Sequence, residues 1–122
     1  MGLPVSTRKI RRIIQDELLK HCSKVYYRRA KNTSGLHVVF RIDDFKAEEV
    51  MRAFALDVRV AGRGDCTDDV EDLADEIWDA FDHLYYLDDD IELHTYQNTR
   101  SIVDEEDASV VHRRLLFEIR AL

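Results

Sequence analysis

The stretch 66–86, CTDDVEDLADEIWDAFDHLYY, constrains the fold most strongly because both of its faces follow a helical period. Its apolar residues recur at steps of three and four: Val70, Leu73, Ala74, Ile77, Trp78, Phe81 and Leu84. The opposite face carries the carboxylates Asp68, Asp72, Asp75, Asp79 and Asp82. We therefore expect an amphipathic helix, capped by Thr67 or Asp65, whose apolar stripe docks on another layer. Trp78 and Phe81 are its expected core anchors.

Alternating apolar and polar residues predict strands on both sides of this helix. The chain begins with a short lead-in at 1–6 and a second amphipathic helix over 7–22, for which Ser6 is the expected N-cap. Strands are expected at 24–30, 36–43, 50–61, 91–103 and 109–122. The first two should form a hairpin around the turn cluster at 31–35. The order α-β-β-β-α-β-β predicts one α+β domain over 1–122, with two helices on an antiparallel-rich sheet of about five strands.

Charge is distributed unevenly along the chain, whose formal net charge is −7. Residues 1–31 carry nine Lys or Arg against two acids, whereas residues 43–107 carry 22 acids against five bases. Such an asymmetry predicts a surface with oppositely charged poles. Arg8, Lys9, Arg11 and Arg12 crowd the first turns of the 7–22 helix, where cations oppose the helix dipole. They face solvent, an acidic neighbour or nucleic acid.

Histidines and cysteines occur at no spacing that a metal site or a nucleophile requires. The histidines are scattered, and alternation places His37, His94 and His112 on the solvent side of their strands. Cys22 and Cys66 form no C-x-x-C pair and are expected to be reduced thiols.

Acidic runs at 88–90 and 104–107 are the remaining candidates for chemistry. Neither has the internal Gly and terminal Glu of a calcium loop, and such runs are usually hydrated turns. A small acidic metal-dependent hydrolase that uses these two runs is the alternative from a different functional class. We expect instead no enzyme, no cofactor and no metal. No apolar run approaches the ~20 residues that span a bilayer, and a cytosolic start is expected because the N-terminus lacks a signal core.

Several segments agree in order and length with one known family. A turn at 32–35 precedes HVVFRID, and FALDVRV leads into DVEDLADEIWDAFD. YQNTRSIVDEED and HRRLLFEIRAL then close the chain, with Arg100, Asp104, Asp107 and the pair Arg113 and Arg114 around the last turn. In this order, residues 25–122 resemble the tail terminator, or tail completion, proteins of long-tailed bacteriophages. The N-terminal helix agrees in position only.

The resemblance implies a structural virion protein of the tail–neck region, assembled in the host cytoplasm. Such proteins form a ring, usually a hexamer, that caps the tail tube, halts its polymerisation and joins the tail to the head connector or stopper protein. The implied partners are copies of the chain, the tail tube protein and the connector. DNA only passes through, and no membrane, catalysis or cofactor is implied. Another head–tail adaptor or minor tail protein is the alternative within the same class.

Two sets of residues are the expected contact surfaces of such a ring. The subunit or partner interface is expected at Arg8, Arg11, Arg12, Arg100, Asp104, Asp107 and Arg113. The acidic set comprises Asp68, Asp72, Asp75, Asp79 and Asp82. Three interpretations of this acidic face stay open: contact with solvent, contact with a neighbour's basic first helix, or the lining of a DNA passage whose carboxylates repel phosphates.

Overall fold

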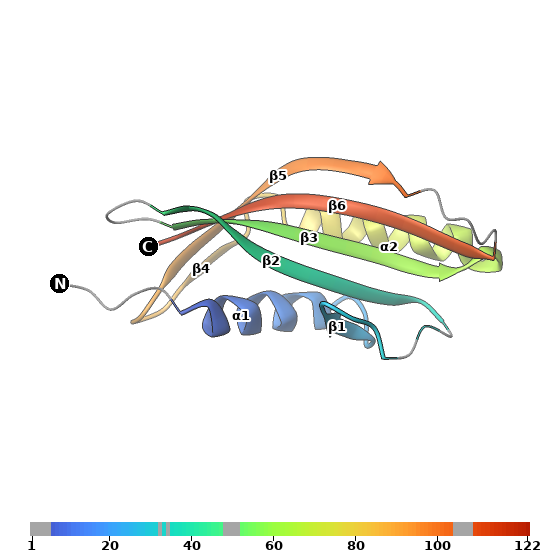
Figure 1. Cartoon of the computed structure of the whole chain (residues 1–122), viewed down its shortest axis with the longest axis horizontal. Helices are drawn as coiled ribbons and strands as arrows, with labels where there is room; N and C mark the ends of the chain where they lie inside the picture. Colours follow the sequence, from blue (N-terminus) through green and yellow to red (C-terminus); the bar gives the residue numbers. More distant parts are fainter. Residues whose placement is uncertain (1–5, 32, 34, 48–51, 104–108) are drawn as a thin grey trace.

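A computed structural model describes residues 6–31, 33, 35–47, 52–103 and 109–122, which form two helices and six strands (Figure 1). The elements are α1 (Thr7–Leu19), β1 (Val25–Tyr27), β2 (His37–Ala47), β3 (Arg52–Arg63), the 3-10 turn η1 (Gly64–Cys66), α2 (Thr67–Ala80), β4 (Tyr85–Leu87), β5 (Glu92–Ile102) and β6 (Val110–Ala121). The expected single α+β domain is confirmed. Neither helix is long and apolar enough to cross a membrane within the described ranges.

All six strands belong to one sheet, in the order β1-β2-β3-β6-β5-β4. The four long strands are antiparallel neighbours, with β3 and β6 paired over their whole length at its centre. Figure 1 shows the sheet curling, so that β4 approaches the beginning of α1. One strand was not expected: β4 begins inside the stretch 66–86 that the helical period covers and ends just beyond it.

The expected hairpin between 24–30 and 36–43 is wrong, because β1 runs parallel to β2. Val25 lies beside Val38 and Tyr27 lies beside Phe40 in the register of this pair. The chain leaves β1 at Arg28, whose φ of 70° breaks the extended conformation. Alternation predicts that a run is a strand but leaves its direction against the next strand unspecified.

Helix α2 begins one residue after the predicted start and ends at Ala80, six residues before the predicted end. Neither predicted cap is used, because Cys66 occupies the N-cap and Thr67 donates its hydroxyl to the Gly64 carbonyl. At the other end, His83 adopts a φ of 57°, which a continuing helix excludes. The N-cap of α1 is confirmed, since Ser6 Oγ accepts a hydrogen bond from the Lys9 backbone N–H at 3.2 Å.

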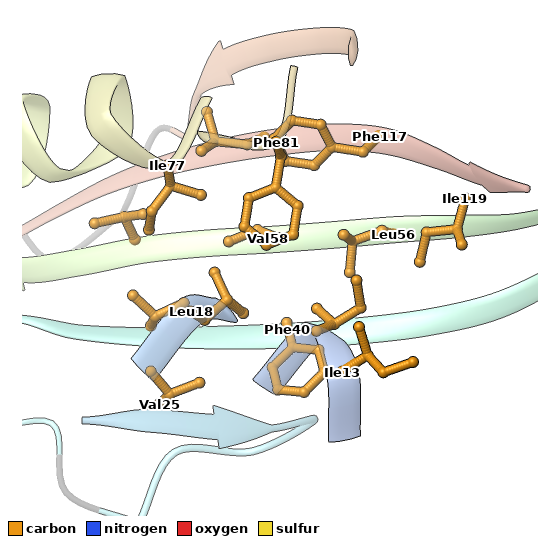
Figure 2. Close-up of a cluster of buried hydrophobic side chains, with 14 of the residues drawn as sticks. Ile13, Leu18, Val25, Phe40, Leu56, Val58, Ile77, Phe81, Phe117 and Ile119 are labelled. Atoms are coloured by element: carbon orange, nitrogen blue, oxygen red, sulfur yellow. The ribbon is translucent and has the colours of Figure 1, made fainter. Parts of the chain in front are cut away.

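Both helices pack on the same face of the sheet, and one apolar core lies between the layers (Figure 2). Ile13 of α1 lies beside Phe40 of β2 there, whereas Ile77 of α2 and Phe81, at the C-cap of α2, lie near Val58 and Phe117. The largest fully buried side chains are Phe40, Phe54, Phe81, Phe117, Ile10, Ile14, Leu18, Leu56, Ile77, Leu93, Leu115 and Ile119. The packing therefore joins α1 to the β1–β2 side of the sheet and α2 to the β3–β6 centre.

Phe81 and Trp78 test the docking of α2, because both rings pack on Phe117, at centroid distances of 5.4 and 5.2 Å. Phe81 is fully buried, whereas Trp78 is only partly buried. Phe81→Ala should lower the free energy of unfolding by about 3–5 kcal/mol, and Trp78→Ala by less. Urea unfolding followed by circular dichroism measures both; equal losses would contradict this difference in burial.

Gly62 provides a second test, because Val70 of α2 packs directly against it on β3. A Cβ at Gly62 would lie 2.9 Å from Val70 Cγ2, closer than a carbon contact allows. Gly62→Ala should therefore cost about 1–3 kcal/mol of stability by overpacking. Gly35→Ala is the matched control, since its Cβ would meet only the end of Lys24 at 3.6 Å. Gly62→Ala should cost less in a Val70→Ala background than in the wild type, and equal costs in both backgrounds would count against the contact.

Candidate functional site

A basic surface lies where the first turns of α1 meet the end of β1. Arg11 and Arg28 stack on the ring of Tyr27, with guanidinium carbons 5.2 and 5.6 Å from its centroid. Together with Arg8 they line a cavity of about 380 Å³ whose apolar part includes Ile42. None of the described residues that line this cavity is acidic. We call Arg8, Arg11 and Arg28 the basic side.

Arg12, predicted to act with Arg8 and Arg11, lies on a different flank of α1. It lines a groove of about 530 Å³ between α1 and β4, to which Arg8 also contributes. Asp16 and Glu17 lie in the same groove, so its lining has mixed charge. The structure therefore brings Arg8 and Arg11 together on the basic side. Arg12 lies instead in a groove where carboxylates offset its positive charge. Arg28 was not in the predicted set.

The exposed face of α2 forms an acidic surface. Asp68, Asp72, Asp75, Asp79 and Asp82 are all exposed, as the helical period predicts. We call these five residues the acidic side.

Two predicted interface arginines pair with α2 inside the chain. Arg100 on β5 donates to Asp75 and stacks over Trp78, with its guanidinium carbon 5.5 Å from the ring centroid. Arg113 on β6 donates to Glu71. The helix is therefore partly neutralised, although no base occurs in its own sequence. Asp104 and Asp107, predicted for the same interface, lie outside the described residues.

The basic side lies at the β1 border of the sheet, whereas the acidic side lies over its centre and reaches toward β5. Helix α1 contacts β1, the first strand of the sheet order, whereas α2 contacts β3 and β6 and is tied to β5 by Arg100. A surface of one sign on each side allows head-to-tail contact between copies, because one copy's basic side can meet the next copy's acidic side.

The acidic run 88–90 serves as a turn. Asp88 Oδ1 accepts from the backbone N–H groups of Asp90 and Ile91, at 2.8 and 2.9 Å. Asp88 Oδ2 lies 2.6 Å from Lys9 Nζ and accepts from the Tyr86 hydroxyl at 2.8 Å. The Lys9 ammonium and the backbone donors hold the pKa of Asp88 well below its usual range, while the same contacts raise the pKa of Lys9 and of Tyr86. Asp88 thus joins the β4–β5 turn to α1.

The face of the sheet opposite the helices carries a charged cluster that alternation predicted only in part. Asp57 is 8% exposed although it lies on the face that neither helix covers. Its Oδ2 pairs with Arg114 at 3.0 Å and with Arg59 at 3.4 Å. A cavity of about 300 Å³ adjoins the cluster, with Arg28, Arg29, Arg41 and Arg59 in its lining. Alternation along the predicted strand 50–61 puts Asp57 on its polar face. The burial of the Asp57 carboxylate, however, depends on the neighbouring strand β6, which alternation does not predict.

The predicted solvent position is wrong for His37, which is buried and contacts the Gly35 carbonyl at 2.8 Å. His94 and His112 are half-buried. Both cysteines are free thiols, with Cys22 buried and Cys66 half-buried. No group of His, Cys, Asp and Glu able to hold a metal occurs in the part of the chain that the structure describes.

Asp88→Asn tests the electrostatic tie between α1 and the β4–β5 turn. A depressed folded-state pKa means that the carboxylate stabilises the fold fully above its ordinary value of 3.8, and that this contribution is lost as the pH falls through the folded-state value. The melting temperature of Asp88→Asn should therefore lie below wild type at neutral pH, and the gap should shrink below about pH 4. The exposed Asp89→Asn should show no gap; a pH-independent gap for Asp88→Asn would contradict the electrostatic cause.

Comparisons with known proteins bear on the fold. No family model matches the chain, and no curated protein matches it. One solved structure, whose name states no function, is similar over 98% of this chain and 97% of its own length, with a TM-score of 0.72 and 13% sequence identity. At this identity the likeness concerns architecture, and it extends over almost all of both chains. The chain is thus similar to a known α+β structure from end to end.

Proposed function

We propose that the chain is a subunit of a phage neck ring that terminates the tail tube and joins it to the head connector. The observation that carries the proposal is the separation of the two sides over one sheet, with the basic side at the β1 border and the acidic side over the centre toward β5. Heterologous contacts of this kind repeat in one direction, and they close into a ring when the rotation per copy divides a full turn.

The sequence resemblance is the second support. The described chain keeps the expected order of helices and strands, with two differences. Strand β4 is an addition, and β1 runs parallel to β2 instead of antiparallel. Among ring-forming proteins, the resemblance favours a tail terminator. Within this proposal the partners are further copies of the chain, the tail tube protein and the connector or stopper protein, and the location is the tail–neck region of the virion.

The acidic side is accessible to a partner in such a ring. Asp68, Asp72 and Asp79 project from the outer surface of α2 and are exposed. They are therefore available to the basic side of the next copy or to a central passage. In a passage, carboxylates from every copy would repel DNA phosphates and let the genome slide without binding. A ring structure that puts these residues on the outer rim would remove the passage role and leave the neighbour or solvent role.

Assembly is the first property to test. Arg8→Glu combined with Arg11→Glu should raise the concentration needed for self-association by at least about tenfold, because acids would then face acids. Higher salt should weaken association of the wild type in the same direction. Lys31→Glu combined with Arg63→Glu reverses two exposed charges that do not line the cavity of the basic side and is the matched control. Light scattering measures each size; equal behaviour of both double variants would overturn the charge pairing.

Tube capping tests the function itself. The wild-type chain, added to a polymerising tail tube protein, should bind one end of the tubes and stop their growth. Electron microscopy should show a ring at that end, and tube lengths should shorten as the chain is increased. A ring that leaves the tubes growing but binds the connector would instead indicate a head–tail adaptor.

A further inference from the structure

Each side of the sheet ends in a short strand that covers only part of its long neighbour. Strand β1 pairs with Val38–Phe40 of β2, and β4 pairs with residues 92–94 of β5. Among the described residues, no strand pairs with the outer edge of β2 at 41–47 or of β5 at 97–102. Exposed backbone edges of this kind are ready to accept a further strand.

The backbone hydrogen bonds show which residues face outward along the free edge of β2. Val38 N–H donates outward to the Lys24 carbonyl, and the Phe40 carbonyl accepts from Arg28 N–H. Backbone groups alternate between the two sides of a strand, so the N–H and carbonyl groups of Ile42, two residues after Phe40, also point outward.

On β5, Val103 N–H donates inward to the His112 carbonyl, so Ile102 and Arg100 face outward. Ile42 and Ile102 consequently both present unpaired backbone groups at a free edge.

The side chains at these two positions are complementary. Ile102 is 63% exposed and shares the phase of Arg100, whose side chain pairs with α2, so it lies on the helix face of the sheet. Ile42 lies on the same face, where it lines the cavity of the basic side. An exposed apolar residue at one free edge thus matches an open, partly apolar cavity at the other.

We propose that the free edge of β5 in one copy adds to the free edge of β2 in the next copy, with Ile102 opposite Ile42. The strands β2 and β5 run in opposite directions in the sheet, so a sheet continued in the same orientation joins them as an antiparallel pair. Both helices stay on one face of the continuous sheet. The acidic side of one copy then lies next to the basic side of its neighbour, which selects a second copy of this chain as the occupant.

The short strands pair with residues of β2 and β5 other than Ile42 and Ile102. In the antiparallel pair, β1 lies beyond the Ile102 end of the incoming strand, whereas β4 of that copy lies beyond the opposite end of the free β2 edge. In the sheet order Ile42 shares a row with Gln97, and the bulge in β5 puts Ile102 four rows away, so pairing Ile42 with Ile102 offsets successive copies by about 14 Å along the strands. Bulges between Asp44 and Lys46 and between Gln97 and Thr99 interrupt both edges and limit the number of alternative registers.

The inference rests on the proposed ring, and it names the two surfaces through which the copies meet. Because the edges differ, the contact is heterologous and each copy uses both. The stagger tilts the strands against the ring axis, as tilted strands do in closed sheets.

Cysteine cross-linking tests the pairing directly. All variants carry Cys66→Ser, since Cys66 is only half-buried. Under mild oxidation, Ile42→Cys alone and Ile102→Cys alone should stay monomeric on a denaturing gel. Their mixture should give a covalent dimer and nothing larger, and the double variant should give a ladder that ends at the size of the ring. Directly opposite strand residues lie within disulfide reach.

A matched control uses Ile42→Cys with Ser101→Cys, because alternation puts residue 101 on the opposite face of β5 from Ile102. This pair should form no ladder. A dimer from Ile102→Cys alone would indicate a symmetric contact and overturn the inference. The absence of a dimer from the mixture at every concentration would leave the free edges to a different chain and also overturn it.

The two proposals fail in different ways. A ladder from the double variant, together with tubes that keep growing, would support the edge pairing and reject tail termination. Tubes capped by the mixed single variants without any cross-link on the capped ends would support tail termination and reject the edge pairing.

Discussion

Packing of both helices on one face of the sheet is the constraint on which the charge distribution depends. The four long strands present apolar side chains to that face, so α1 and α2 must lie together over them. Each helix then turns its polar residues outward, and the sheet holds them apart. Cations from α1 and the end of β1 gather at one side, and the carboxylates of α2 gather toward the other. The uneven distribution of charge along the sequence thereby becomes an uneven distribution over the surface.

Periodicity predicted most of the fold because most elements bury one face against a single core. Ser6, the stripe of α1, five strands and the docking of α2 all follow from local patterns. The end of α2 and the existence of β4 do not, since the helical period continues to Leu84. There the backbone of Leu84 bonds to Thr95 in both directions, and this distant partner decides the conformation. The parallel direction of β1 is equally invisible to an alternating pattern.

The candidate site was predictable to the extent that it depends on exposure. The carboxylates on the outer face of α2 follow from its period, as does a basic first helix. Their partners do not, because Arg100 and Arg113 reach α2 from strands far along the chain. The burial of Asp57 and the free edges of β2 and β5 require the strand order and the lengths of the short strands. These are tertiary properties, and a single sequence carries no local signal for them.

The contact between Lys9 and Asp88 has a mechanical consequence. It ties the start of α1, beside β2, to the turn between β4 and β5, so the two borders of the curled sheet are braced against each other. In the proposed ring, a copy that docks through one border would hold its other border rigid, and less conformational entropy would be lost when the next copy arrives. Growth of the proposed ring would then be cooperative, with few partial rings between free subunits and the closed assembly.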